Sequence, residues 1–347
     1  MSDPVVVTGA AGFIGHAVSA RLLDRGETVI GVDNLNEYYD PGLKLARLST
    51  LLTRQGFQFE RLDVANAEAF GALVLKSGAK RLVHLAAQAG VRYSLDHPFE
   101  YEHSNIAAHL SVLEACRAVS GFRHLTYSSS SSVYGDRTMT TRGFHEDDPC
   151  NRPVSLYAAT KRSCELMSSS YAALFGFPQT GLRFFTAYGP WGRPDMAYYR
   201  FAELMLRGEP IEVYGAGAMA RDFTYIDDIV DGVLGALDGP PPAGAHRILN
   251  VGGSCPIKLL QMIETLERAL GCSANKIMRG MQPGDVRATY ANTSKIHALT
   301  GYSPKVGLEE GLKRFAEWFL AFHSLQNSVP TAAQPIERPL VSEHAPA

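Results

Sequence analysis

The segment GAAGFIG at residues 9–15 limits the possible folds of this chain more than any other stretch. It follows a short β-branched run at 5–8 and leads into a helical pattern of apolar residues over 13–25. Gly9, Gly12 and Gly15 allow a tight turn, a close approach of backbone to a pyrophosphate, and close packing of helix on strand. The same spacing also occurs in plain tight turns, so the surrounding pattern has to decide.

Apolar runs alternate with helical patterns through the first half of the chain. Strand-like runs occur at 27–34, 57–64, 81–87 and 124–130, and the pattern continues through a helix at 157–174 and a strand at 179–189. A long helix is also expected over 101–119. Runs that are apolar on both faces and separated by helices are typical of a parallel sheet covered on two sides. The sequence therefore predicts an α/β fold, a doubly wound parallel sheet of the Rossmann type.

The second half of the chain is less regular and mixes short strands, Gly- and Pro-rich loops and amphipathic helices. We predict a nucleotide-binding domain formed by 1–187 and 225–252. A smaller, mixed lobe formed by 188–224 and 253–323 would bind the substrate. Residues 324–347 contain four prolines and little periodicity, which is typical of a flexible tail.

Composition argues against several classes of function. The 33 basic and 35 acidic residues give a formal charge of -2, so neither a nucleic acid nor an anionic membrane is an expected partner. The five cysteines are scattered without metal-ligand spacing, so no metal site is expected. No apolar run approaches roughly 18 residues and no signal-peptide pattern opens the chain, which favours a cytoplasmic protein.

Polar side chains follow the next two predicted strands. Asp33 ends the second strand, where a carboxylate binds both hydroxyls of an adenosine ribose and repels a 2′-phosphate. This position favours NAD over NADP, with Asn34 and Asn36 as further contacts. Asp63 and Val64 follow the third strand and would reach the adenine. Asp63 could equally be the N-cap of a helix at 67–75.

Tyr157 and Lys161 stand four residues apart in YAATK, so they share one face of a helix. A phenol is a poor base at neutral pH unless a neighbouring cation stabilises its phenolate, and Lys161 would supply that cation. This spacing is common in helices and also fits a solvated pair. Here it follows a nucleotide-binding turn and five consecutive serines at 128–132.

These motifs resemble the extended short-chain dehydrogenase/reductases, a family of nucleotide-sugar epimerases and dehydratases. The resemblance covers about residues 4–320, and within the family the chain is most similar to the UDP-glucuronate 4-epimerases. The stretches that carry it are long and contiguous: DNLNEYYDPGLKLARL, HLAAQAGVRYS, SSSSSVYG, PVSLYAATK, LRFFTAYGPWGRPDMA and RDFTYIDDI.

The resemblance implies a tightly bound NAD that is regenerated in each turnover. Tyr157 would take the proton of the sugar 4-hydroxyl while hydride leaves carbon 4, and the 4-keto sugar would turn over before hydride returns. Ser130, three residues before the valine of VYG, would share that proton. The implied cofactor contacts are Gly9, Gly12, Phe13, Ile14, Gly15, Asp33, Asn34, Asn36, Asp63, Val64, Leu85, Ala86, Ala87, Asn105, Tyr157 and Lys161.

The resemblance also points to a uronate substrate. Related decarboxylases have glutamate at the position of Ser132, and a hydroxyl there binds a carboxylate that a glutamate would repel. UDP-galactose epimerases typically have asparagine at the position of Thr186. Arg193 offers a planar fork for a carboxylate, although it could instead be a structural residue paired with Asp195. The other three serines, Ser128, Ser129 and Ser131, are expected to finish the strand, and Ser129 could also line the cofactor site.

The resemblance also implies contacts for the nucleotide half of the substrate. Arg221 would reach the diphosphate or ribose, the backbone near Val213 the uracil, and Asp285 the ribose. Arg92 would face the diphosphate or the surface. Many relatives have arginine where this chain has Gln282, so Arg279 or Arg287 would have to substitute for it.

Interconversion of UDP-glucuronate and UDP-galacturonate without decarboxylation is therefore the favoured function. Epimerisation of another UDP-hexose, such as UDP-glucose or an N-acetyl form, is the first alternative, and decarboxylation of UDP-glucuronate is the next. A catalytically silent NAD-binding scaffold is disfavoured because Ser130, Tyr157 and Lys161 are all present. The family also implies a homodimer in which two long helices of each subunit pair, with those at 101–119 and 157–174 as candidates.

Overall fold

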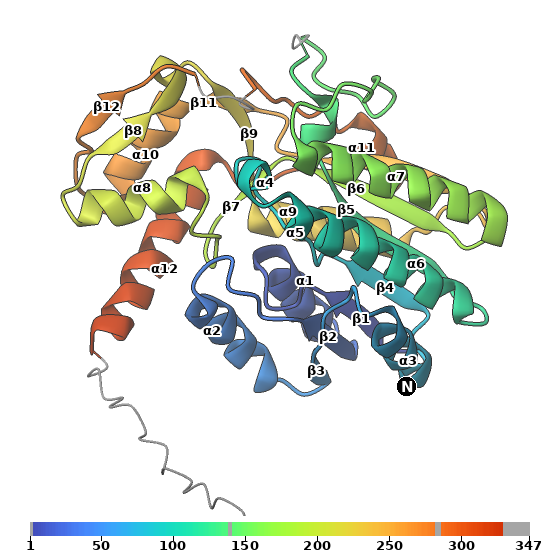
Figure 1. Ribbon diagram of the computed structural model, residues 1–347. Helices are drawn as coiled ribbons and strands as arrows, with labels where there is room; N and C mark the ends of the chain where they lie inside the picture. Colours follow the sequence, from blue (N-terminus) through green and yellow to red (C-terminus); the bar gives the residue numbers. More distant parts are fainter. Residues whose placement is uncertain (1–2, 138–140, 282–285, 329–347) are drawn as a thin grey trace, which may run out of the picture.

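A seven-stranded parallel sheet forms the centre of the computed structural model, which describes residues 3–137, 141–281 and 286–328 (Figure 1). The strand order is β10-β6-β5-β4-β1-β2-β3, and each neighbouring pair is parallel. The strands are β1 Val5–Thr8, β2 Val29–Asp33, β3 Phe57–Arg61, β4 Arg81–His84, β5 His124–Ser130, β6 Gln179–Phe184 and β10 His246–Val251. The predicted doubly wound sheet is confirmed.

Helices cover both faces of this sheet because its strands are apolar on both faces. Val5 and Val7 of β1 belong to one hydrophobic core, and Val6 between them belongs to the other, as alternating side chains require. On the first face α1 packs against α2 and α9, and on the second α6 packs against α3 and α7. The helices are α1 Phe13–Asp24, α2 Pro41–Leu52, α3 Ala67–Ser77, α6 Ala108–Ala118, α7 Leu156–Phe175 and α9 Ile226–Asp238.

The long helix expected over 101–119 is interrupted. A short helix α5, Pro98–Tyr101, leads into a π-helical turn at Glu102–Ala107 before α6 begins. The turn contains Asn105, whose amide accepts a hydrogen bond from the backbone N–H of Gln88 at 2.8 Å. The same amide donates to Thr160 Oγ1 on α7 at 3.0 Å. The periodicity of the sequence could not show this wider turn, because its buried polar side chain is held by distant residues.

Most of the remaining elements gather at the upper left of Figure 1, but α11, Ser294–Thr300, lies at the upper right and packs against α9 and β10. Strand β9 pairs with β7 in parallel and with β11 in antiparallel, and β8 pairs with β12. Helix α10 packs against α8 and α12. The bounds are β7 Thr186–Tyr188, β8 Ile211–Val213, β9 Ala220–Tyr225, β11 Pro256–Lys258, β12 Lys276–Met278, α4 Tyr93–Asp96, α8 Ala197–Leu206, α10 Leu259–Leu270, α11 Ser294–Thr300 and α12 Leu308–Ser328.

Residues 225–252 return to the main sheet, since α9 packs against α1 and β10 extends the sheet beside β6. The division of the chain into two domains stays a prediction. Within the described ranges, no helix is both long and apolar enough to span a membrane.

Candidate active site

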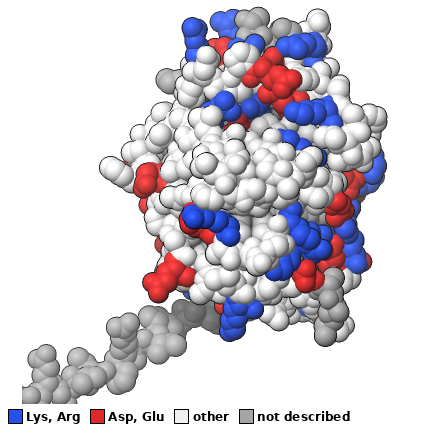
Figure 2. Space-filling model, turned by 90° about the vertical axis from the view of Figure 1, so that its right-hand side faces the viewer, with Lys and Arg blue, Asp and Glu red and all other residues white. Residues whose placement is uncertain are grey.

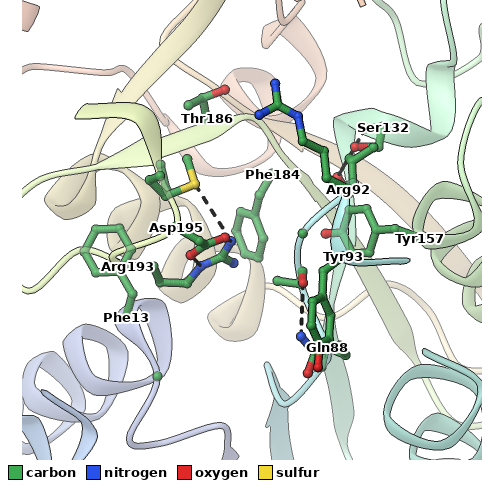
Figure 3. A pocket seen from close by; sticks show the side chains of 18 of the residues that line it. Phe13, Gln88, Arg92, Tyr93, Ser132, Tyr157, Phe184, Thr186, Arg193 and Asp195 are labelled. Carbon is green, nitrogen blue, oxygen red and sulfur yellow. Dashed lines mark hydrogen bonds and ion pairs between the residues drawn. The ribbon is translucent and has the colours of Figure 1, made fainter. Parts of the chain in front are cut away.

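A cavity of about 970 Å³ lies along the carboxyl ends of the central strands, where an open α/β sheet places its ligands. Its wall includes the glycine turn, the serine-rich end of β5, and side chains from β7, α7 and the smaller strands. In Figure 3, the Tyr157 hydroxyl, the Arg92 guanidinium and the Arg193–Asp195 pair point into the same space. Residues far apart in the sequence therefore face a single site.

The glycine turn has the geometry of a pyrophosphate site. Gly9 has φ +72°, and a Cβ at Gly15 would stand 2.0 Å from the carbonyl oxygen of Gly9. Helix α1 starts at Phe13, and no side chain caps its N-terminus. The N–H groups of the first turn can therefore meet an anion, as a dinucleotide cofactor requires.

Asp33 is buried at the end of β2, on the cavity wall. Its carboxylate accepts hydrogen bonds from the backbone N–H of Ala11 at 3.1 Å and of Leu35 at 2.8 Å. The side chain is thus held beside the glycine turn, in the place expected for a ribose ligand. Lys44 also lines this end of the cavity and donates to the carbonyl of Asn36 at 2.7 Å. The only signal for Lys44 in the sequence is its place within DNLNEYYDPGLK, which does not by itself indicate a role.

Asp63 lines the cavity and is not a helix cap. It accepts hydrogen bonds from the backbone N–H of Ala65 at 2.9 Å and from the Asn34 amide at 3.3 Å. The N-cap of α3 is Asn66, whose side chain accepts from the N–H of Ala69. A cap at Asp63 would require α3 to begin at the next residue, but α3 begins at Ala67. The alternative interpretation of Asp63 as the helix cap was therefore wrong.

Tyr157 and Lys161 lie on one face of α7, which begins at Leu156 behind the N-cap Ser155. Lys161 is buried, and its ammonium donates to the carbonyl oxygen of Ser128 at 3.0 Å and to its Oγ at 3.1 Å. Ser128, expected only to finish the strand, therefore positions the cation. The half-buried Tyr157 ring packs edge-on against Tyr101, with 6.1 Å between ring centroids.

Ser130 and Ser132 form a small hydroxyl pair on the same wall. Ser130 Oγ donates to Ser132 Oγ at 3.1 Å and accepts from the Ser132 N–H at 3.1 Å. Ser129 lines the cavity too, but its hydroxyl donates to the buried Glu165 carboxylate at 2.6 Å. The catalytic candidate Ser130 and Ser132, the serine proposed to face a carboxylate, thus lie beside each other at the end of β5.

Arg193 lines the cavity and forms a bidentate pair with Asp195. The distances are 2.9 Å from Nε to Oδ1 and 2.7 Å from Nη2 to Oδ2. Burial acts to lower the pKa of the Arg193 guanidinium, but Asp195 outweighs it and the pKa is raised. The structural pairing that the sequence left open is therefore present. Thr186, half-buried on β7, lines the same cavity.

The residues expected to bind the nucleotide half of the substrate do not all line the cavity. Arg92 and Arg221 line the cavity, and Arg92 also stacks over the Tyr214 ring at 5.2 Å. Val213 is fully buried and is not part of the wall, whereas its neighbours Glu212 and Tyr214 are.

Five further sequence candidates do not contribute a described side chain to the wall. Asn105 is buried behind it, with its amide bonded to Gln88 and Thr160. Asp285 and Gln282 lie outside the described residues. Arg279 pairs with Glu212 at 3.0 Å, and neither Arg279 nor Arg287 is part of the wall.

The profile of a family described as the NAD dependent epimerase/dehydratase family matches residues 5–252, which include the glycine turn and the Tyr157–Lys161 pair. The chain belongs to this family. The resemblance to extended short-chain dehydrogenase/reductases is thereby confirmed, and NAD is the cofactor of this epimerase/dehydratase-family protein.

Similar sequences extend over nearly the whole chain. UDP-glucuronate 4-epimerase 3 of Arabidopsis thaliana is 45% identical over 334 residues, which cover 92% of this chain and 77% of the relative. A probable UDP-glucuronate 4-epimerase of Rhizobium meliloti is 42% identical over 330 residues, covering 90% and 96%. A crystal structure of UDP-glucuronic acid 4-epimerase from Bacillus cereus, in complex with UDP-glucuronic acid and NAD, superposes with a TM-score of 0.85. Its sequence identity is 35%, with 92% of this chain and 99% of that chain covered.

A buried ion pair supports the serine-rich end of β5. Arg183 on β6 donates to Glu165 on α7, from Nε at 2.8 Å and from Nη2 at 2.9 Å. Glu165 stands one helical turn beyond Lys161 and also accepts from Ser129. Arg183 therefore has a structural role as an ion-pair partner. Glu165 was missed, because its partners lie on two other elements.

Within the described ranges, no group of three or more acidic, histidine or cysteine side chains could hold a metal ion.

Proposed function

We propose that this protein is an NAD-dependent 4-epimerase that interconverts UDP-glucuronate and UDP-galacturonate and retains the sugar carboxylate. The observation that carries the proposal is that one cavity joins two sets of residues. The first is the proton-transfer set Tyr157, Lys161 and Ser130. The second is the set of carboxylate ligands Ser132, Thr186 and Arg193. The names of the similar Arabidopsis and Rhizobium proteins support the same substrate.

Bound NAD would supply a hydride acceptor for carbon 4 of the sugar and return the hydride later. Tyr157, as phenolate, would accept the proton of the 4-hydroxyl, and the Lys161 ammonium would stabilise the phenolate charge. Ser128 supports this step because its two oxygens hold Lys161. Ser130 would donate or accept a hydrogen bond at the 4-oxygen, and its bond to Ser132 orients its hydroxyl.

Retention of the carboxylate needs separate control. A uronate oxidised at carbon 4 is a β-keto acid, which loses carbon dioxide when the bond to the carboxylate aligns with the ketone π system. Ser132 and Thr186 would hold the carboxylate by hydroxyl donors, and Arg193 would add a charged donor. Among the described residues, Nη1 of Arg193 has no hydrogen-bond partner, so this edge can serve the substrate while Asp195 holds the other.

Epimerisation of a neutral UDP-hexose is the second candidate, and the Arg193–Asp195 pair favours it. Since Asp195 already balances the charge of Arg193, a neutral sugar could occupy the cavity without leaving an unpaired cation. A similar solved structure, MoeE5 in complex with UDP-glucose and NAD, is 31% identical with a TM-score of 0.80.

The deciding experiment incubates the purified protein with UDP-glucuronate and no added NAD, and separates the products chromatographically. UDP-galacturonate as the main product supports the proposal, together with its tightly held cofactor. UDP-xylose as the main product would indicate decarboxylation. A preparation that contains NAD but converts UDP-glucose and leaves UDP-glucuronate unchanged would establish the second candidate.

We also propose a cytoplasmic homodimer that pairs α6 and α7 of the two subunits. Apolar side chains on this helical face are exposed: Leu110 by 43%, Leu166 by 56% and Leu174 by 70%, with Phe99 of α5 exposed by 84%. Figure 2, which shows the side where α6 and α7 end, has few charged side chains across its middle. Exposed apolar patches of this kind are typical of interfaces. Light scattering after size-exclusion chromatography tests the proposed dimer. A monomer at micromolar concentration would contradict it.

A further inference from the structure

Arg47, on α2, is one of the largest fully buried side chains in the described part of the chain. Its Nε and Nη2 donate to the carbonyl of Trp191 at 3.0 and 2.7 Å, and Nη2 also donates to the carbonyl of Gly192 at 2.9 Å. Nη1 donates to the carbonyl of Ala11 at 3.1 Å and to the hydroxyl of Tyr39 at 2.8 Å. All five hydrogen bonds of the guanidinium therefore go to oxygen atoms that carry no charge.

This arrangement is costly for a structural residue. Across the described ranges, no carboxylate lies within ion-pair distance of Arg47. Burying a cation without a counter-ion costs several kcal/mol, and an apolar side chain of similar volume would fill the space at lower cost. The retained charge therefore indicates a task that packing alone does not perform.

The residues held by Arg47 belong to two different parts of the cavity. Ala11 is in the glycine turn of the cofactor site, and Trp191 and Gly192 directly precede Arg193. Arg47 is thus a bridge between the turn that receives the cofactor and the loop that carries a substrate-binding arginine. The sequence separations of 36 and 144 residues show that only the tertiary structure joins them.

The Trp191 backbone explains why such a bridge is needed. Trp191 has φ +63°, in the left-handed region that residues other than glycine rarely adopt. Two of the five Arg47 hydrogen bonds end on the Trp191 carbonyl, so they stabilise this peptide orientation. The Trp191 ring packs against His16 of α1 and Trp318 of α12, with centroids at 5.7 and 5.1 Å. Without Arg47, the strained turn could relax and carry Arg193 away from its place.

We propose that Arg47 is a positioning residue that couples cofactor binding to recognition of the substrate carboxylate. It holds the 191–192 turn in its left-handed form and so sets where Arg193 stands relative to the glycine turn. A pyrophosphate at residues 9–15 would bring negative charge to the turn that Arg47 contacts, which strengthens the bridge when the cofactor is bound. The inference rests on the proposed function for the identity of the carboxylate substrate, but not for the cofactor side of the bridge.

The experiment compares Arg47→Met and Arg47→Lys with wild type, each purified with its cofactor. For Arg47→Met we expect the KM for UDP-glucuronate to rise at least about tenfold with a smaller change in kcat, because a displaced Arg193 weakens binding. NAD should also dissociate at least about fivefold faster, measured by released NAD after gel filtration. Arg47→Lys keeps the charge and up to three donors, so it should restore part of both properties. The affinity for UDP, which lacks the carboxylate, should stay within about twofold.

Arg54→Met is the matched control. Arg54 follows the same helix and donates to Asp24 at 2.7 Å and to the carbonyl of Ala20 at 3.1 Å, away from the cavity. This variant should lose some thermal stability without a change in KM or in NAD release. If Arg47→Met and Arg47→Lys change only thermal stability, as the control does, the positioning role is wrong.

Two further outcomes have a defined meaning. If Arg47→Met does not fold, Arg47→Lys decides alone: normal KM and normal NAD release overturn the inference. If wild type does not turn over UDP-glucuronate, the proposed function fails, and NAD release by the two variants still tests the bridge. Unchanged NAD release in that case overturns the inference as well.

Discussion

The guanidinium of Arg193 and the carboxylate of Asp195 form a bidentate ion pair on the cavity wall, and the Tyr38 hydroxyl donates to the same carboxylate at 3.2 Å. Asp195 therefore does two things at once. It fixes the plane of the arginine fork, and it balances the charge of the fork when no anionic substrate is bound. Under the proposed function, this pairing would set how selective the cavity is for a charged sugar, because a uronate would meet an arginine that is already partly neutralised.

Arg193→Ala should lower kcat/KM for UDP-glucuronate by roughly 10²-fold, since a charge-assisted hydrogen bond to the carboxylate is lost. The affinity for UDP-glucose should change little. Steady-state kinetics with product chromatography measures the first quantity, and calorimetric titration measures the second. Arg207→Ala is the control, because Arg207 is exposed and lies outside the cavity wall. An equal loss for both sugars would mean that Arg193 supports the fold of the loop rather than substrate selectivity.

Tyr157→Phe should reduce turnover by roughly 10³-fold, because no other group in its place accepts the 4-hydroxyl proton. Bound NAD and the affinity for the UDP-sugar should be retained. Tyr101→Phe is the matched control, since this neighbouring tyrosine donates to backbone carbonyls at 89 and 90 and is not part of the wall. It should stay within a few-fold of wild type. Substantial residual activity in Tyr157→Phe would shift the role of base to another residue.

Glu165→Gln should destabilise the protein at neutral pH by about 3 kcal/mol, because it breaks a buried pair with Arg183. Burial acts to raise the pKa of Glu165, but the bonds from Arg183 and Ser129 prevail and the pKa is lowered below its usual value. A lowered pKa in the folded state means that this stabilisation is complete above the unfolded pKa and is lost as pH falls through the folded one. The difference between wild type and variant in denaturant unfolding should therefore shrink at acidic pH, and a constant difference from neutral to acid would contradict it.

Gly15→Ala should abolish stable NAD binding, since the added Cβ would collide with the carbonyl of Gly9 and distort the turn. Absorbance of the cofactor released from the purified protein measures this. Gly71→Ala is the matched control, because Gly71 lies within α3 and an added Cβ has no atom within 4 Å. That control should retain NAD and gain about 0.5–1 kcal/mol of stability from the higher helix propensity of alanine. Full NAD content in Gly15→Ala would refute the assignment of the turn.

Patterns along the chain predicted the features that depend on local backbone chemistry. The glycine turn, the alternation of apolar strands and helices, and the pair Tyr157 and Lys161 each lie within a few residues, so spacing alone indicates their geometry. The fold class, the family and the nature of the cofactor followed from them. Helix bounds were predicted within a few residues wherever the apolar period was unbroken, as for α7 at Leu156–Phe175.

Only the tertiary structure decided which polar side chains pair with one another. Ser128 holds Lys161 across 33 residues, Arg183 pairs with Glu165, and Arg47 bridges the glycine turn to the Trp191 carbonyl across 144 residues. Arg193 could have been free or paired with Asp195 as far as its spacing showed. The physical reason is that a hydrogen bond requires a donor–acceptor distance that is correct to within a few tenths of an ångström. Strands and helices far apart in the sequence set that distance only after they pack. The sequence by itself thus determined the scaffold and the cofactor turn, and packing determined how the charged groups of the site are held.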